Sequence, residues 1–140
     1  MTKKKVCPFL LRTVAGVIEI LAFAHPYAGN QIVKGTLETG ETALTAAKRE
    51  LFEESGIELT KQPIQIGSSD NIVEGQVWYF FQCEAANLPD AWSFQTLDDE
   101  GHVFEFFWQP LFEDLTFEWH HQFKRSIQFI RLNHRLASPE

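Results

Sequence analysis

Apolar residues gather in short stretches along the chain, and these stretches predict strands. Their Val, Ile, Leu and aromatic content is typical of sheet, in residues 5–11, 14–24, 31–33, 76–84 and 102–109. Pro63 and Gly67 flank a further short strand. Residues 76–84 are apolar on both alternating faces, which is typical of an interior strand covered on both sides. Turn-forming residues at 25–30 and 87–90 separate these segments.

Two segments repeat apolar residues at helical spacing instead. The helix expected over 41–55 has an apolar stripe that we expect to pack on a sheet, made by Ala43, Leu44, Ala47 and Leu51. A second helix is expected over 117–136, with a stripe made by Phe123, Ile127 and Ile130. Strands interleaved with two helices predict an α/β fold in which a mixed β-sheet is covered by helices on both faces.

Length and charge limit the function classes. A chain of 140 residues is long enough for one domain over 1–140 and too short for two. The net charge is −7 without a long basic run, so we expect no binding to long nucleic acid. We interpret the triplet Lys3-Lys4-Lys5 as a short, solvated patch of charge at the N-terminus.

The two cysteines indicate the compartment. Cys7 and Cys83 lie in apolar stretches, so we expect buried thiols without a disulfide, in a reducing environment. The chain has no stretch that resembles a signal peptide or a membrane span. We therefore expect a cytoplasmic protein without a membrane partner.

Three carboxylates on the first helix suggest chemistry. Glu50, Glu53 and Glu54 stand at i, i+3 and i+4, so they share one helix face. Like charges at this spacing destabilise an isolated helix by about 0.2–0.5 kcal/mol per pair. Such a cluster is usually a solvated surface, but a divalent cation that takes carboxylate oxygens would turn the repulsion into binding.

The residues around this cluster favour the binding of a divalent cation over a solvated surface. Gly35 is followed after five residues by Glu41, and after seven more by the run Arg49-Glu50-Leu51-Phe52-Glu53-Glu54-Ser55-Gly56-Ile57. This pattern resembles the Nudix box, a glycine, x5, E, x7, REUxEExGU with U aliphatic, and every specified position matches. The chain is identified as a member of the Nudix hydrolases, the MutT-like nucleoside diphosphate-X pyrophosphohydrolases, without a subfamily. The resemblance implies an α/β/α sandwich around a mixed sheet.

The resemblance also implies a reaction. Nudix enzymes hydrolyse a pyrophosphate bond in a small nucleoside diphosphate linked to another group, with Mg²⁺, or Mn²⁺ as a substitute, and water attacking phosphorus. Carried over by position, the metal site consists of Glu50, Glu53, Glu54 and the carbonyl of Gly35, with Glu54 as the clearest ligand. Glu50 and Glu53 divide ligand and proton-accepting roles in a way that the sequence leaves open.

Other box positions have a structural interpretation. We expect Glu41 and Arg49 to form a half-buried ion pair that fixes the loop to the helix, with a direct catalytic role for Arg49 as the alternative. Gly56 stands where a left-handed C-cap is needed, and Ile57 follows it as the hydrophobic contact of that cap.

Candidates outside the box are less constrained. Glu100, and after it Glu105, could supply a further catalytic acid, against the alternative of a solvated acidic loop. Lys34, Trp92 and Phe94 are candidate substrate contacts, the aromatic rings as stacking surfaces for a base.

The flanks of the box resemble a bacterial subgroup, although Val33 stands where that subgroup has proline. Many relatives form homodimers. An alternative function is a catalytically silent Nudix-fold module that binds or senses a nucleotide, but the intact box favours an enzyme.

Overall fold

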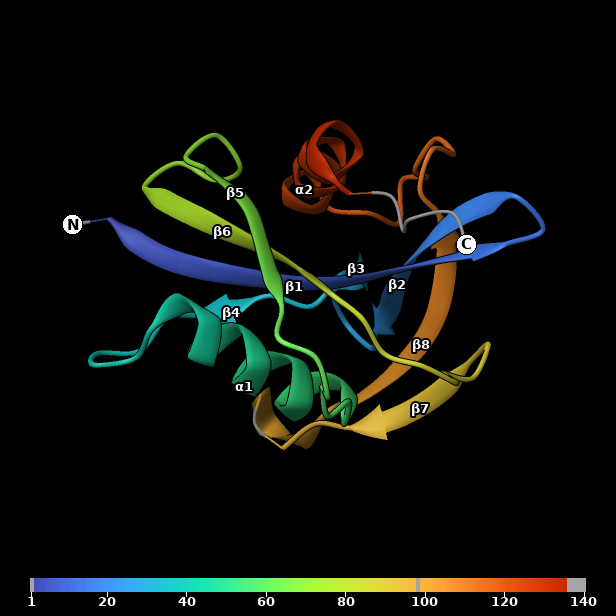
Figure 1. Ribbon diagram of the computed structural model, residues 1–140, viewed down its shortest axis with the longest axis horizontal. Helices are drawn as coiled ribbons and strands as arrows, with labels where there is room; N and C mark the ends of the chain where they lie inside the picture. Colours follow the sequence, from blue (N-terminus) through green and yellow to red (C-terminus); the bar gives the residue numbers. More distant parts are fainter. Residues whose placement is uncertain (1, 98, 136–140) are drawn as a thin grey trace.

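A mixed sheet with one long helix on each face forms the molecule (Figure 1). The computed structural model describes residues 2–97 and 99–135. The strands are β1 (Lys3–Val14), β2 (Val17–His25), β3 (Gly29–Gln31), β4 (Gly35–Thr36), β5 (Ile64–Ser69), β6 (Gln76–Cys83), β7 (Trp92–Gln95) and β8 (Val103–Pro110). The helices are α1 (Ala43–Ser55), the short 3₁₀ turn η1 (Asp99–Gly101) and α2 (His121–Asn133).

The sheet runs in the order β5-β6-β1-β2-β8-β7, with β3 beside β2 and β4 beside β1. β1 and β6 are parallel and the other strand pairs are antiparallel, which confirms the mixed sheet. On its edge away from β6, β1 pairs with β4 at Lys5 and Val6 and with β2 from Leu11 to Val14. The sheet therefore forks between these two pairings, and α1 packs against both β1 and β4 beside the fork.

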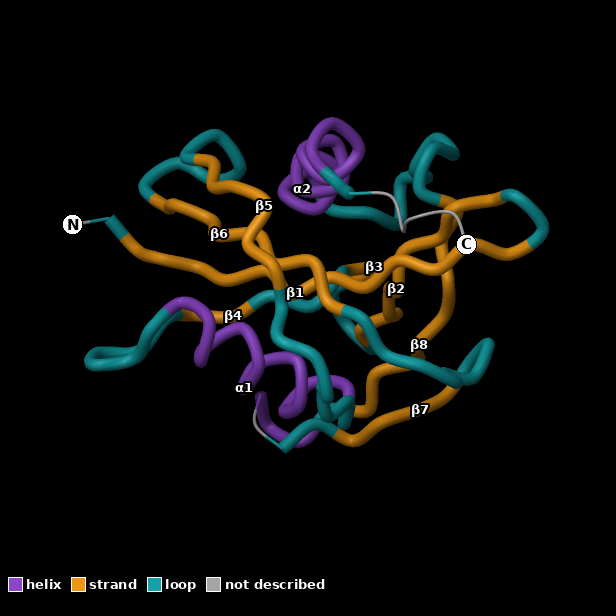
Figure 2. The backbone as a smooth tube through the Cα atoms, viewed as in Figure 1, coloured by secondary structure: helices purple, strands orange, loops and turns teal. Residues whose placement is uncertain are grey.

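The two faces of the sheet carry separate cores. Ala47 and Leu51 of α1 are buried against one face, where Ala43 and Leu44 pack at the margin as expected. The stripe Phe123, Ile127 and Ile130 of α2 is buried against the other face. β6 serves both cores because Trp78 and Phe80 face α2 while Phe81 and Cys83 face α1. This arrangement, visible as two helices on opposite sides of the strands in Figure 2, confirms the sandwich.

α1 begins at Ala43, not at Glu41 as expected, because Thr42 is the N-cap. The Thr42 side chain accepts a hydrogen bond from the Thr45 backbone N–H, which satisfies one of the free donors of the first turn. The other end matches the expectation. Gly56 adopts φ 78°, and its N–H donates to the Phe52 carbonyl.

Two predicted strands were wrong in their bounds. Residues 14–24 are interrupted at Ala15 and Gly16, whose φ values of 50° and 81° make the tight hairpin between β1 and β2. The strand expected at 31–33 is displaced, because β3 ends at Gln31 and β4 starts at Gly35.

The second helix is shorter than expected at both ends. His120 caps α2 with extended backbone, and its ring accepts from the Gln122 N–H. The preceding Trp119 is buried and forms a bridge to Asn30, which holds residues 117–119 outside the helix. Leu136 lies outside the described residues. Within the described part of the chain, no helix is long and apolar enough to cross a membrane.

Two further expectations concern single side chains. Cys7 and Cys83 are buried free thiols, as expected, and burial raises the pKa of Cys83 to about 12. Lys3 and Lys4 are exposed, as the interpretation of a solvated triplet requires, whereas Lys5 is exposed only in part. That side chain is half-buried on β1, where its Nζ donates to Thr36 Oγ1 at 2.7 Å, because the triplet is strand and not a free end.

Candidate active site

The backbone of Gly35 lies directly against the side chain of Glu50. A Cβ added to Gly35 would overlap the Glu50 carboxyl group, so a larger residue here must displace the Glu50 side chain. The Glu50 side chain is only 8% exposed. The loop before α1 and the acidic face of the helix are thus joined at the point where the box begins.

Arg49 connects most of the acidic residues of the box. Its Nε and Nη2 donate to the two carboxylate oxygens of Glu41, at 2.7 and 3.0 Å. Its Nη1 reaches Glu50 Oε1 at 2.8 Å and Glu53 Oε2 at 3.2 Å. Nη2 also donates to the carbonyl of Thr36, at 3.1 Å. One guanidinium therefore ties the strand, the loop and the helix together.

These contacts change the acid–base properties of both partners. Hydrogen bonding from Arg49 is the main cause that holds the pKa of Glu41 below its usual value. The pKa of Arg49 is raised, first by its hydrogen bond with Glu41 and further by Glu50, against the opposing effect of burial. The Glu41 side chain is 12% exposed. The geometry agrees with the half-buried ion pair that we expected from the sequence.

The three box carboxylates lie together on α1, but not as an assembled metal site. Glu50 and Glu53 both face Arg49 Nη1, and Glu54 follows on the same helix face. Among residues 2–97 and 99–135, no three His, Cys, Asp or Glu side chains are arranged as a group that could hold a metal ion. Carboxylate oxygens are nonetheless the donors that Mg²⁺ and Mn²⁺ prefer. A dication bound here would share Glu50 and Glu53 with Arg49.

The segment before β8 lies against the C-terminal half of α1. The Leu97 N–H donates to the Glu53 carbonyl at 3.1 Å, and the Thr96 N–H donates to the His102 carbonyl at 2.9 Å. Glu100 in this segment has an 86% exposed side chain and faces His102 Nε2 at 3.6 Å. Glu105 accepts a hydrogen bond from Ser93. In this arrangement the two candidate acids have partners of their own, outside the box.

A group of rings that the sequence analysis missed lies beside this segment. The His25 and His102 ring centroids are 5.1 Å apart, and Tyr27 is 5.4 Å from His102. His25 Nδ1 accepts hydrogen bonds from the backbone N–H groups of Tyr27 and Ala28, so it fixes the turn before β3. The histidine-proline turn was visible in the sequence, but its closeness to His102 depends on the pairing of β2 with β8.

Trp92 and Phe94 occupy a strand, β7, that was not among the strands expected from the sequence. Trp92 stacks on Phe106 with ring centroids 4.8 Å apart, and its Nε1 donates to the Ser55 carbonyl. Phe94 lies against Gly56, where a Cβ would contact its ring at 2.6 Å. Both rings are half-buried and pack at the C-terminal end of α1.

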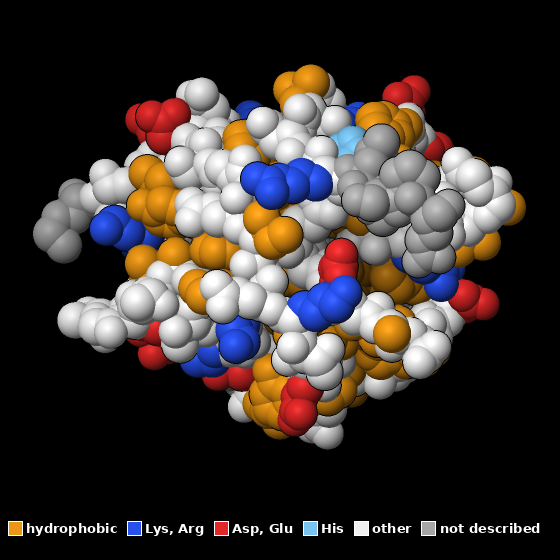
Figure 3. Space-filling model, viewed as in Figure 1, with side chains coloured by type: hydrophobic (Ala, Val, Ile, Leu, Met, Phe, Trp, Pro, Cys, Tyr) orange, Lys and Arg blue, Asp and Glu red, His pale blue; other side chains and the backbone are white. Residues whose placement is uncertain are grey.

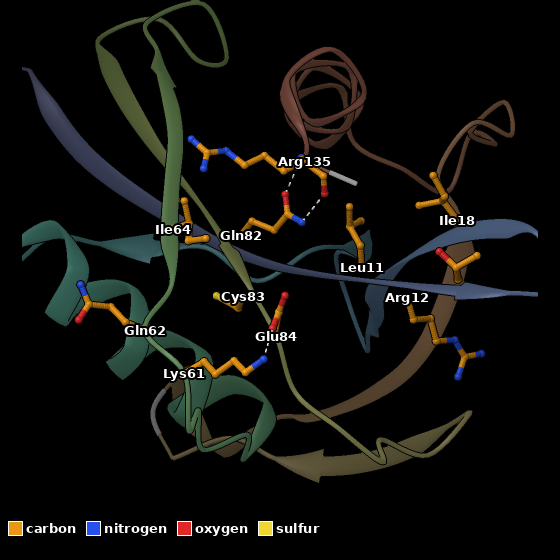
Figure 4. Close-up of a pocket in the computed structure, with 11 residues that line it drawn as sticks. Leu11, Arg12, Ile18, Lys61, Gln62, Ile64, Gln82, Cys83, Glu84 and Arg135 are labelled. Carbon is orange, nitrogen blue, oxygen red and sulfur yellow. Dashed lines mark hydrogen bonds and ion pairs between the residues drawn. The ribbon is translucent and has the colours of Figure 1, made fainter. Parts of the chain in front are cut away.

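Two surface pockets lie away from the box carboxylates. One, of about 310 Å³, is bounded by β1, β2, β5 and β6 near the end of α2. Figure 4 shows two pairings among its lining residues, Lys61 with Glu84 and Gln82 with the backbone of Arg135. The other, of about 560 Å³, is lined by Trp92 and the residues after α1. On the face in Figure 3, Lys and Arg side chains form separate groups and no continuous stripe.

The comparison with known families decides the classification. The family model of the NUDIX domain matches residues 11–127. The chain belongs to the Nudix family. The box read from the sequence, with Gly35, Glu41, Arg49 and the glutamates of α1, lies within that match. The Nudix family generally consists of pyrophosphohydrolases. No curated protein sequence matches the chain.

Solved Nudix structures share the fold. The NUDIX domain of Shewanella oneidensis NrtR, complexed with ADP ribose, is 13% identical, with a TM-score of 0.67 and coverage of 94% of this chain and 88% of that chain. The MutT NUDIX hydrolase from Burkholderia pseudomallei is 18% identical, with a TM-score of 0.65 and coverage of 91% and 97%. A C. elegans Ap4A hydrolase is 22% identical, with a TM-score of 0.54 and coverage of 79% and 81%. At these identities the likeness establishes the Nudix fold.

The contact between Gly35 and Glu50 gives a direct test. Gly35→Ala is expected to cost about 1–3 kcal/mol in the free energy of unfolding, because the methyl group must displace the Glu50 carboxyl from Arg49. Urea unfolding measures this cost. A Glu50→Ala background is the matched control, because it removes the side-chain atoms that the added methyl group would meet. Equal losses from Gly35→Ala in both backgrounds would mean that Glu50 does not set the requirement at position 35.

Proposed function

We propose that the protein hydrolyses the pyrophosphate bond of a small nucleoside diphosphate-X substrate, with Mg²⁺ or Mn²⁺, as a nucleotide house-cleaning or salvage enzyme. We further propose that it does so as one domain over residues 1–140. A cytoplasmic location and a homodimer remain predictions from the sequence.

The observation that best supports this proposal is that residues of the complete box, which come from a strand, a loop and a helix, contact one another in the fold. Gly35, Glu50 and Arg49 connect β4, the loop and α1, and they hold the carboxylates on one face of the helix. This is the arrangement that the resemblance implies for binding a metal and a pyrophosphate together. Fixed groups aimed at developing charge lower a transition state without the cost of reorganisation.

The residues divide into three roles. Glu54, Glu53 and Glu50, with the Gly35 carbonyl, would hold the metal ion, which when bound supplies charge neutralisation for the phosphate oxygens. Glu50 or Glu53 would accept the proton of the attacking water, while Glu100 is the candidate for an acid outside the box. Arg49 positions these groups through its hydrogen bonds with Glu41, Glu50 and Glu53.

A second candidate function is a module that binds a nucleotide without cleaving it. One observation favours it, namely that Glu50 and Glu53 face Arg49 and are not arranged with a third acid around a common point within the described residues. A Nudix domain with this fold binds ADP ribose. Lys34, Trp92 and Phe94 remain candidates for substrate contacts under either function.

A substrate panel with and without metal separates the two functions. We expect one class among nucleoside triphosphates, dinucleoside polyphosphates, ADP-ribose and nucleotide sugars to release phosphate product at millimolar Mg²⁺. Excess chelator is expected to reduce turnover to the background rate, with recovery on adding Mn²⁺. If nothing turns over while a panel compound raises the melting temperature, the binding module replaces the enzyme.

A further inference from the structure

The last turn of α1 carries two of the three box carboxylates, Glu53 and Glu54, and ends at the Gly56 cap. The final carbonyl groups of a helix have no partner within the helix, so helix ends fray first. Repulsion between Glu50 and Glu54, at i and i+4, adds to this tendency. Whatever fixes the last turn of α1 therefore also fixes the geometry of the proposed metal site.

Two of these carbonyl groups accept hydrogen bonds from residues 92–97, which comprise β7 and the two residues after it. The Ser55 carbonyl accepts from Trp92 Nε1 at 3.4 Å, and the Glu53 carbonyl accepts from the Leu97 N–H at 3.1 Å. Figure 1 shows β7 running beside the end of α1. The last turn is thus held by a segment outside the box and not by water alone.

The rings of β7 complete this contact. Trp92 and Phe94 share one face of the strand, since they are its two partly buried residues and are two positions apart. Phe94 lies so close to Gly56 that a Cβ there would meet its ring at 2.6 Å. Trp92 stacks on the buried ring of Phe106, with the ring centroids 4.8 Å apart. The contacts to α1 are therefore anchored in the core.

We propose that Trp92 and Phe94 are positioning residues, which hold the last turn of α1 so that Glu53 and Glu54 keep the geometry that a metal ion requires. The consequence for hydrolysis rests on the function proposed above. Ligands must be held within about 0.5 Å of the productive geometry, and a helix end reaches this only with support from its surroundings. This role differs from a stacking contact with a base, because the two rings contact α1 and the core directly.

Trp92→Phe tests the role, with Trp108→Phe as the matched control. Both substitutions keep an aromatic ring and remove one indole N–H, but Trp108 Nε1 donates to the Pro89 carbonyl and not to α1. Amide hydrogen exchange without metal reports on the last turn through the Gly56 N–H, which donates to the Phe52 carbonyl. We expect this N–H to exchange about fivefold faster in Trp92→Phe and at the wild-type rate in Trp108→Phe. A general loss of stability would instead speed exchange in the central strand β6 to the same degree.

Metal binding and kinetics separate positioning from substrate contact. In Trp92→Phe and in Phe94→Leu, calorimetry with Mn²⁺ and no nucleotide should give a Kd about three- to tenfold higher than in wild type. With a hydrolysed substrate, the half-saturating Mg²⁺ concentration should rise to the same degree. KM for the nucleotide at saturating Mg²⁺ should stay within about twofold, because the rings do not contact the substrate.

The alternatives give different results. A raised KM with unchanged metal binding would overturn the proposal in favour of a stacking contact. Unchanged exchange at Gly56 in Trp92→Phe, or equally fast exchange in Trp108→Phe, would contradict it as well. If the wild-type protein binds Mn²⁺ but hydrolyses nothing, the proposed function fails, whereas exchange and metal binding still decide the positioning role. A wild-type protein that binds no Mn²⁺ refutes both.

Discussion

Glu54→Gln is expected to lower kcat at least about 10²-fold for the substrate that the wild-type protein hydrolyses, the loss typical of removing one contact to transition-state charge. Glutamine keeps the shape of the side chain and removes the charge that we propose holds a dication. The acidic face of α1 contains three carboxylates at i, i+3 and i+4, so the variant also relieves repulsion. Its melting temperature without metal should therefore equal or exceed that of wild type.

Glu58→Gln is the control for this experiment. Glu58 is exposed, lies four residues after Glu54 and follows the Gly56 cap, so it is no longer on the helix. The same change of charge there should leave kcat and the magnesium requirement unchanged. A titration of activity against Mg²⁺ should show a higher half-saturating concentration for Glu54→Gln. If the two variants have equal activity, Glu54 is not a metal ligand.

Much of the local structure was predictable because its causes are local. Gly56 was read as a left-handed cap and adopts φ 78°. The stripe Ala43, Leu44, Ala47 and Leu51 was read as a packing face, and Ala47 and Leu51 are fully buried while Ala43 and Leu44 are partly buried. The start of α1 was missed although Thr42 directly precedes the apolar stripe, which is itself an N-cap pattern. β7 was missed because Trp92–Gln95 has only four residues, too few for a clear alternation.

The spatial relations of the site were not predictable in the same way. The closeness of Lys5 to Thr36 depends on the pairing of β1 with β4, and that of His25 to His102 on the pairing of β2 with β8. Pairings between distant segments leave no trace in local periodicity. The box motif predicted the residues of the acidic face, but the contact of Gly35 with Glu50 depends on how β4 and α1 pack in the folded protein.

Arg49→Met is expected to lower the free energy of unfolding by about 3–5 kcal/mol, because it leaves charges buried without their partner. The Glu50 and Glu41 side chains are 8% and 12% exposed, and both depend on this guanidinium. Urea unfolding at neutral pH measures the loss. Lys61→Met is the control, since Lys61 pairs with Glu84 at the surface, where the two side chains are 74% and 62% exposed. Its loss should stay within about 1 kcal/mol, as for surface pairs.

The dependence of this loss on pH follows from Glu41. Arg49 lowers the pKa of Glu41 in the folded protein, so the pair stabilises the fold above the unfolded pKa of about 4.3. This contribution disappears as the pH falls through the lowered folded pKa. The difference in stability between wild type and Arg49→Met should therefore narrow below about pH 4. A difference that stays constant down to acid pH would mean that the lost packing of the arginine stem, and not its charge, causes the effect.

Magnesium binding should show whether Arg49 and the metal ion contact the same carboxylates. In wild type, Arg49 and a dication at the proposed site would share Glu50 and Glu53, whereas in Arg49→Met the dication would be their main source of positive charge. Saturating Mg²⁺ is therefore expected to raise the melting temperature of Arg49→Met more than that of wild type. Equal shifts would show that the metal binds elsewhere on the acidic face. In that case Arg49 organises the loop and the helix without competing for the metal ligands.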